Sequence, residues 1–335
     1  MPTILAIESS CDETAVAVVS GGAGVRARVR ASLVSSQIDL HREYGGVVPE
    51  LASRNHLLRL RPLVERAMEE AGCRIGELDA VAATSGPGLA SSLLIGSTAA
   101  KGIALAAGIP YLGVNHLEGH LLSPFIDRTG VPRHLSLIIS GGHTLLVGVE
   151  SAGKYRRIGG TRDDAAGEAY DKVGKMLGLP YPGGPEIEKA AHRGDPAAFA
   201  FPRPMLRDVH HDFSFSGMKT AVLYTLRKLD PPYPVPDLAA SFQRALIDIL
   251  TGKTIRAARD LGYDMVAVSG GVSMNRAVRA AFERACADHG LGFAIADAEF
   301  RTDNAAMIGF AGLLRQLAGK STPLESDIHP HLPLV

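Results

Sequence analysis

One pattern of strands and helices occurs twice in this chain of 335 residues, and it constrains the fold more than any other feature. Residues 4–19 (ILAIESSCDETAVAVV) and 135–149 (LSLIISGGHTLLVGV) each read as two apolar strands joined by a short polar turn. The same predicted series follows each hairpin: a strand, a helix, a strand, a glycine loop, a helix, a strand and a further helix. Internal duplication of this kind predicts an α/β protein built from two similar halves.

The two halves can be set side by side element by element. The first hairpin is followed by predicted strand 25–34, helix 50–72, strand 79–85, helix 89–107 and strand 109–114. The second is followed by strand 154–161, helix 164–177, strand 264–269, helix 274–288, strand 291–296 and a last helix from about 303. An insert at 180–236 holds 10 of the 20 prolines and is expected to elaborate the second half, with a helix near 216–228.

Two such units with one hairpin each resemble the actin-like ATPase fold shared by sugar kinases and Hsp70. In that fold two lobes surround a nucleotide cleft, and the hairpins face each other across the phosphates. The resemblance implies a first lobe over residues 1–114, to which the segment 320–335 returns, and a second lobe over 115–319 that carries the insert. A shared fold does not by itself assign a function.

Net charge, cysteine spacing and the distribution of apolar residues limit the kinds of protein that this chain can be. The net charge is zero, so a nucleic-acid partner would have to be bound through local basic patches. Cys11, Cys73 and Cys286 lie far apart and form no C-x-x-C motif, as expected in a reducing cytoplasm. The N-terminus lacks a basic region typical of a signal peptide. The most apolar window, residues 89–110, is interrupted by Lys101 and by small residues, which favours a buried helix and strand over a membrane span.

The turn of each hairpin suggests contacts to a nucleotide. Ser140, Gly141 and Gly142 offer backbone amides that a phosphate can approach closely. The glycine loop at 269–271 lies before a predicted helix, whose N-terminal end favours anions. Asp12 and Glu13 occupy the other hairpin turn, and they could share a cation, handle water or simply form a polar turn. No Walker A motif and no G-x-G-x-x-G after a strand occur in the sequence.

The stretch NHLEGH, residues 115–120, raises the question of a metalloprotease. Histidines four apart in a helix lie on one face and can hold one metal ion, so His116 and His120 are candidate ligands. In the zinc-protease motif H-E-x-x-H the glutamate directly follows the first histidine, whereas Glu118 lies about 200° around the helix from His116. The hydrolytic base is therefore missing from its usual place. The alternative is two unrelated histidines on a surface helix.

Eight motifs, taken together, are similar to those of the tRNA N6-adenosine threonylcarbamoyltransferase family, members of which were once described as sialoglycoprotein endopeptidases. They are IESSCDET (7–14), NHLEGH (115–120), IISGGHT (138–144), GEAYDKVGKMLGL (167–179), YPGG (181–184), FSFSGMKTA (213–221), SGGVSMN (269–275) and RTDNAAMIG (301–309). The resemblance runs from about residue 4 to 310. Ser140 in the second hairpin, where archaeal and eukaryotic members carry a tyrosine nearby, points to the bacterial branch and leaves the fourth protein ligand open.

The resemblance implies a site and a reaction. His116, His120 and Asp303 would bind one divalent metal ion, iron first and zinc second, and a magnesium ion is a further option. Asp12 and Glu13 would be the catalytic candidates. The substrate-binding residues carried over by position are Ile138, Ile139, Ser140, Gly141, Gly142, Asp171, Gly184, Glu188 and Asn275. Asp171 and Glu188 would hold ribose hydroxyls, and Asn275 would meet either the threonyl group or the nucleotide.

The implied reaction passes the threonylcarbamoyl group of threonylcarbamoyl-adenylate to N6 of adenosine 37 in tRNAs that read ANN codons, with release of AMP. The implied partners are tRNA, a paralogous actin-like subunit and a small P-loop ATPase, and no membrane. A stripe of apolar residues on helix 50–72 could bind the paralogue or belong to the core: Leu57, Leu60, Val64 and Met68. Two alternatives remain at this stage, a metalloprotease and a non-catalytic nucleotide-binding scaffold.

Overall fold

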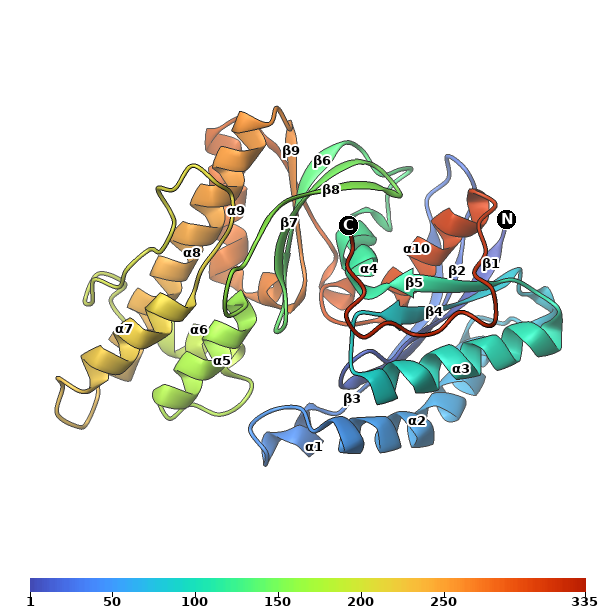
Figure 1. Cartoon of the computed structure of the whole chain (residues 1–335), viewed down its shortest axis with the longest axis horizontal. Coiled ribbons are helices and arrows are strands. Elements are labelled where there is room, and N and C mark those ends of the chain that lie inside the picture. Colours follow the sequence, from blue (N-terminus) through green and yellow to red (C-terminus); the bar gives the residue numbers. More distant parts are fainter. The chain divides into compact units, whose positions relative to one another are not determined.

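The computed structural model describes all residues, 1–335, and the chain divides into two compact units. Unit 1 comprises Met1–Val131 and Ala296–Val335, and unit 2 comprises Pro132–Ile295. Each unit contains one five-stranded mixed sheet (Figure 1).

The sheet of unit 1 has the strand order β3-β2-β1-β4-β5. β1 (Thr3–Glu8) pairs antiparallel with β2 (Glu13–Ser20), and β2 pairs antiparallel with β3 (Arg28–Ser36). On its other side β1 pairs parallel with β4 (Ala80–Gly86), which pairs parallel with β5 (Tyr111–Asn115). The predicted hairpin and strands are therefore confirmed, and the turn that follows Glu8 lies at one end of the sheet.

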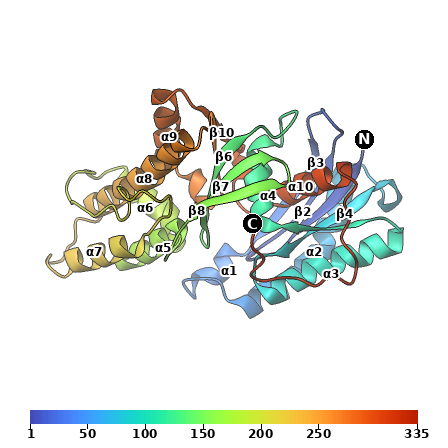
Figure 2. The same cartoon turned by 45° about the horizontal axis from the view of Figure 1, so that its top comes forward.

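Helices cover both faces of this sheet (Figures 1 and 2). On one face α2 (Pro49–Glu70) and α3 (Ala90–Ala107) pack against alternate, inward-pointing residues such as Leu5, Ile7 and Val81. α10 (Ala305–Leu317) packs on the other face, where Gly309 approaches Ala6 and Val19 closely. α4 (His116–Leu122) follows β5 directly and packs against α10, and the short α1 (Ile38–Arg42) precedes α2.

α3 is the one helix of the chain that is long and apolar enough to cross a membrane. Its packing against β4 and α2 buries one face, which includes Leu93, Ala100 and Ala104, whereas Leu94 and Leu105 are exposed. The window 89–110 is thus a helix and a strand as predicted, but the helix is only partly buried.

The sheet of unit 2 repeats the topology of the first. Its order, β10-β9-β6-β7-β8, has the antiparallel pairs β6/β7 and β7/β8 and the parallel pairs β6/β9 and β9/β10. The strands are β6 (His134–Ile139), β7 (Thr144–Ser151), β8 (Lys154–Gly160), β9 (Met265–Ser269) and β10 (Gly292–Ile295). The helices are α5 (Ala166–Met176), α6 (Gly183–Ala191), α7 (Ser216–Leu226), α8 (Val235–Asp260) and α9 (Arg276–Asp288). The duplication predicted from the sequence is present in both sheets.

Two expectations about organisation need correction. The unit boundary differs from the expected 1–114 and 115–319, because α4 and α10 both pack on the sheet of unit 1 and carry residues 116–131 and 296–319 with them. The structure also contains α8, a helix of 26 residues in the long segment before β9 that the sequence pattern does not predict. α8 precedes β9 as α2 precedes β4, and its buried residues run along much of its length because α6 and α9 both pack against it.

Candidate functional site

The helix that carries the two histidines is buried along its whole length. Every residue of α4 is buried, so the alternative of two histidines on a surface helix is wrong. Asn115 caps the helix, with its Oδ1 accepting from the amide of Leu117 at 2.9 Å. Gly119 lies against α10, where an added Cβ would come within 2.9 Å of Ile308 Cδ1. Capping and close packing thus fix the direction in which the imidazoles point.

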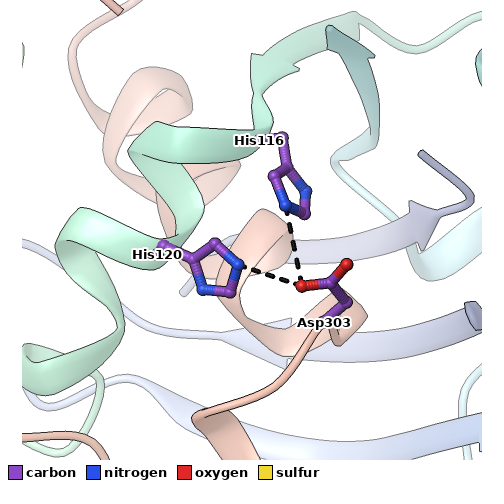
Figure 3. Close-up of side chains that lie close together, drawn as sticks. All are labelled: His116, His120 and Asp303. Atoms are coloured by element: carbon purple, nitrogen blue, oxygen red, sulfur yellow. Dashed lines mark hydrogen bonds and ion pairs between the residues drawn. The ribbon is translucent and has the colours of Figure 1, made fainter. Parts of the chain in front are cut away.

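His116, His120 and Asp303 converge in unit 1 (Figure 3). Oδ1 of Asp303 lies 3.0 Å from Nε2 of His120 and 3.6 Å from Nε2 of His116. Asp303 comes from the loop before α10, far from the histidines in sequence. Ligand atoms about 2.1 Å from one ion at tetrahedral angles lie about 3.4 Å apart, so these separations fit a common metal ion. Two imidazoles and one carboxylate are also a donor set suited to iron or zinc.

The charges around His116 favour a cation at this place. Burial opposes protonation of His116, but the carboxylates of Asp303 and Glu8 outweigh it and raise the pKa of His116 to about 9. Burial likewise opposes ionisation of Glu8, and the facing imidazole of His116 nevertheless lowers the pKa of Glu8. A site that stabilises an imidazolium in this way also stabilises a bound metal cation.

The acidic turn after β1 contributes to the same electrostatic environment. Burial, followed by the charges of Asp303 and Asp12, raises the pKa of Glu13 well above its usual value. Burial and Asp12 also raise the pKa of the Cys11 thiol strongly, so this cysteine stays protonated. Asp12 and Glu13 therefore belong to the electrostatic neighbourhood of Asp303 in unit 1.

Glu118 has a different role from the glutamate of a zinc protease. Its Oε2 accepts from the guanidinium of Arg315 on α10, at 2.6 Å from Nη2 and 3.2 Å from Nε. Arg315 also donates from Nη1 to the carbonyl of Gly113 in β5 at 2.6 Å. The carboxylate thus ties α4 to α10 and β5.

The turn between β6 and β7 leaves backbone amides exposed. Gly141 and Gly142 are exposed, and no hydrogen bond of the chain uses either amide as its donor. An added Cβ on either glycine would meet nothing within 4 Å, and neither has a positive φ. Gly167 of α5 packs beneath the turn and donates to the carbonyl of Ser140 at 3.2 Å. Ile138 and Ile139 are fully buried in β6, which is paired on both sides, so neither residue is exposed to a ligand.

The remaining substrate candidates lie around α6 in unit 2. Oδ1 of Asp171 accepts from the amide of Gly183 at 2.7 Å, which places Asp171 beside Gly184. Burial raises the pKa of Asp171. Oε1 of Glu188 accepts from the amide of Arg276 at 2.7 Å and so reaches the start of α9. Asp171 also interacts with the backbone amide of Gly184, whereas Glu188 keeps a second oxygen.

Asn275 acts as a helix-start residue. Its Oδ1 caps α9 by accepting from the amides of Ala277 and Val278, and its Nδ2 donates to Oε1 of Gln243 at 2.7 Å. Both the oxygen and the nitrogen of its side-chain amide therefore have hydrogen-bond partners within the chain. Beside it, Glu188, Arg244, Arg276 and Arg284 line a cavity of about 610 Å³ in unit 2.

Sequence reasoning missed two residues that contact the helix of the histidines. Glu8 ends β1 and reaches His116, and Arg315 lies in the last turn of α10 and reaches Glu118. Glu8 interrupts an apolar strand immediately before the hairpin turn, and a carboxylate at such a position is a signal that could have been used. Nothing in the sequence around Arg315 indicates its partner.

Solved structures of other proteins establish the fold class. HypF of T. kodakarensis aligns with a TM-score of 0.66 at 15% identity, covering 95% of this chain and 48% of that one. Component A of the Acidaminococcus fermentans (R)-2-hydroxyglutaryl-CoA dehydratase aligns with a TM-score of 0.56 at 15% identity, covering 95% and 100% of the two chains. The chain has a duplicated actin-like ATPase fold, as the sequence predicted.

Sequence comparison identifies the family. The model of the tRNA N6-adenosine threonylcarbamoyltransferase family matches residues 28–310. A relative of that name from Paracidovorax citrulli is 48% identical over 339 aligned residues, which cover 99% of this chain and 97% of the relative. A second, from Ralstonia pickettii, is 49% identical and covers 93% and 91% of the two chains. This chain belongs to the tRNA N6-adenosine threonylcarbamoyltransferase family.

Proposed function

We propose that this protein transfers the threonylcarbamoyl group of threonylcarbamoyl-adenylate to N6 of adenosine 37 in tRNAs that read ANN codons and releases AMP. The observation that carries the proposal is the convergence of His116, His120 and Asp303 in a chain of this family. Nearly the whole chain aligns with relatives of that name, so the sequence similarity extends over both units.

The metal would be held by the Nε2 atoms of His116 and His120 and by a carboxylate oxygen of Asp303, as a divalent iron or zinc ion. When bound, such an ion offsets negative charge on phosphate or acyl oxygens and orients the group that carries them. Three protein ligands leave coordination positions for a substrate, unlike the closed four-ligand sites of structural zinc. The acidic neighbourhood of Asp12 and Glu13 also suits a second, magnesium ion.

Unit 2 would bind the adenylate. The free amides of Gly141 and Gly142 are suited to phosphate oxygens, because they are exposed and have no partner of their own in the chain. Asp171 and Glu188 would accept hydrogen bonds from ribose hydroxyls through the lone pairs that their backbone partners leave free. Gly184 would allow close approach of the sugar to the backbone. Asn275 would act on the ligand indirectly, by fixing the start of α9.

The chemistry is acyl transfer by displacement. The N6 amine attacks the carbamoyl carbon, a C–N bond forms, and the C–O bond to the phosphate of AMP breaks with its electron pair. N6 loses one proton. Glu13 is the candidate acceptor, since a raised pKa brings a carboxylate closer to the range in which it can take up a proton at neutral pH. The exocyclic amine is a weak nucleophile, so positioning of the two reactants carries much of the rate.

The metalloprotease alternative is not favoured by the site. Glu118 is engaged by Arg315 and does not lie where a metal-bound water would be deprotonated. A non-catalytic nucleotide-binding scaffold would need the glycine turn but would have no use for the buried triad.

A paralogous actin-like subunit and a small P-loop ATPase are the proposed protein partners. The apolar stripe of α2 divides into two parts. Leu60 and Met68 are buried in the core of unit 1, and Val64 packs against them, whereas Leu57 and its neighbour Leu58 are 69% and 72% exposed. The exposed pair is the candidate contact for the paralogue.

The proposal can be tested with purified components. The protein, its paralogue and the ATPase are incubated with tRNA and threonylcarbamoyl-adenylate carrying ¹⁴C-threonine. Label should enter tRNA and AMP should be released in equal amount, and neither should occur with Asp303→Asn protein. A complex that cleaves glycoproteins but leaves tRNA unlabelled would overturn the proposal in favour of the protease alternative.

A further inference from the structure

Glu8 is the least exposed carboxylate around the metal-binding candidates. Its side chain is 1% exposed, and it ends β1 immediately before the hairpin turn. The amide of Ser10 donates to Oε1 at 2.5 Å, and the hydroxyl of Thr84 on β4 donates to Oε2 at 2.6 Å. Oε2 also lies 3.0 Å from Nδ1 of His116. A buried carboxylate is costly unless it is satisfied in this way.

These contacts determine which nitrogen of His116 carries a proton. An ionised carboxylate can only accept hydrogen bonds, so Nδ1 must be the donor to Oε2. The hydroxyl of Ser10, 3.1 Å from the same nitrogen, can accept a share of that bond. In the neutral imidazole, Nε2 then has the free lone pair, and Nε2 is the atom that lies 3.6 Å from Asp303.

We infer that Glu8 is a positioning residue of the proposed metal site: it holds His116 in the Nδ1–H tautomer and fixes the ring so that Nε2 faces the ion. Carboxylates that accept from the second nitrogen of a ligating histidine have this effect in other metal sites, where their loss weakens metal binding. His120 has no such support, because its Nδ1 is buried without a hydrogen-bond partner. The site therefore depends on Glu8 for the orientation of one imidazole. This inference rests on the proposed metal site.

A purely structural role is the competing explanation, since Glu8 also links β1 to β4 through Thr84. Glu8→Gln separates the two roles. An amide can accept on one side only, whereas the three donors approach both oxygens: Ser10 on Oε1, and Thr84 and His116 on Oε2. If the amide nitrogen faces His116, it stabilises the Nε2–H tautomer, which blocks the ligating atom. If it faces Ser10, the amide oxygen still accepts from His116, but two donors oppose each other at Ser10, which disfavours this orientation.

The matched control is Ser97→Ala. Ser97 is also buried in unit 1, and its hydroxyl shares a hydrogen bond with Tyr111 at 2.9 Å, but it does not contact His116. Ser97→Ala therefore removes a buried polar contact of the same unit and leaves the imidazole of His116 unchanged. Both variants should lower the thermal midpoint, and only Glu8→Gln should change metal binding.

The experiment measures Zn²⁺ affinity by competition with a chromogenic chelator, together with ¹⁵N-edited NMR of the imidazoles. Glu8→Gln is expected to weaken Zn²⁺ binding by about 10–100-fold while keeping a cooperative melt, and Ser97→Ala is expected to stay within about twofold of the wild type. In the zinc-loaded wild type, His116 should bind through Nε2 and show a slowly exchanging Nδ1–H.

Each outcome decides between the explanations. Equal Zn²⁺ affinity in Glu8→Gln and wild type would overturn the inference while leaving the metal site intact, and binding through Nδ1 in the wild type would overturn it even if the variant fails to fold. A wild type that binds no Zn²⁺ or Fe²⁺ would instead contradict the metal site of the proposed function.

Discussion

Glu118 and Arg315 join the helix of the two histidines to the last helix of unit 1, through hydrogen bonds of 2.6 and 3.2 Å between one carboxylate oxygen and the guanidinium group. The carboxylate is nearly buried, with 7% of the Glu118 side chain exposed, and the guanidinium is about a third exposed. Because Arg315 also binds the carbonyl of Gly113, three elements meet at this pair. The glutamate of the H-x-E-G-H motif thus has a structural explanation that needs no hydrolytic chemistry.

Arg315→Met is expected to destabilise the protein by about 1–3 kcal/mol, because it leaves the buried carboxylate of Glu118 without its charged partner. Metal content should stay near that of the wild type, since the ligands themselves are unchanged. Urea unfolding and elemental analysis measure the two quantities. An unchanged unfolding midpoint would mean that the pair contributes nothing to holding α4.

Asp303→Asn is expected to lose most of the bound metal while keeping a cooperative melt, because the amide is a much weaker ligand than the carboxylate. His289→Ala, which removes an exposed histidine of unit 2, is the control and should keep the metal. Inductively coupled plasma mass spectrometry of the purified proteins gives the stoichiometry. Retention of a full equivalent by Asp303→Asn would remove Asp303 from the ligand set.

Metal affinity is expected to rise with pH. The metal-free protein holds a proton on His116 up to a pKa of about 9, and the ion must displace that proton from the ligating nitrogen. Below about pH 9 the apparent affinity should therefore fall by up to about tenfold per pH unit. Zn²⁺ titrations at about pH 6, about pH 7 and about pH 8 test whether the affinity rises with pH. A pH-independent affinity would show that His116 is neutral before the metal binds.

Gly142→Val is expected to leave the fold intact and to abolish binding of AMP. A side chain at 142 meets nothing within 4 Å and the residue has no positive φ, so the cost in stability should be below about 1 kcal/mol. The valine would instead occupy the space in front of the free amides. Isothermal titration with AMP compares it with Gly141→Ala, which should be milder. Unchanged affinity in Gly142→Val would place the nucleotide elsewhere.

Leu57→Asp is expected to give a folded protein that no longer co-purifies with the paralogous subunit, because Leu57 is 69% exposed on α2. Leu60→Asp is the contrasting variant. Leu60 is 5% exposed in the core of unit 1, and a buried unpaired charge there should prevent folding. If Leu57→Asp still co-purifies, the paralogue binds a different face.

The duplication could be predicted because hydrophobic periodicity and glycine loops recur in the same order in both halves. α8 could not, because its long buried faces obscure helical periodicity and prolines precede it in the insert. The unit boundary was placed too early for a related reason. Whether α4 and α10 pack on the first or second sheet depends on contacts such as Gly309 against Ala6 and Val19, which no local pattern reveals.

The triad could be proposed from its residue types and from the family resemblance, and the structure brings its three side chains together. Its supporting contacts could not be predicted, since Glu8 and His116 are 108 residues apart and Arg315 and Glu118 are 197 apart. The glycine loops also differ in what they require. Gly270 has φ +89, and an added Cβ would lie 2.5 Å from the carbonyl oxygen of Ile139, so this position needs glycine for the backbone itself. Gly86 and Gly88 in the loop of the first half have the same requirement, whereas Gly141 and Gly142 do not.

The most direct test of the account is mass spectrometry of the nucleosides of total tRNA after depletion of this protein in its own host. N6-threonylcarbamoyladenosine should fall in proportion to the depletion and return with the wild-type gene, but not with the gene for Asp303→Asn. A normal level of the modified nucleoside in cells that lack the protein would contradict the proposed function.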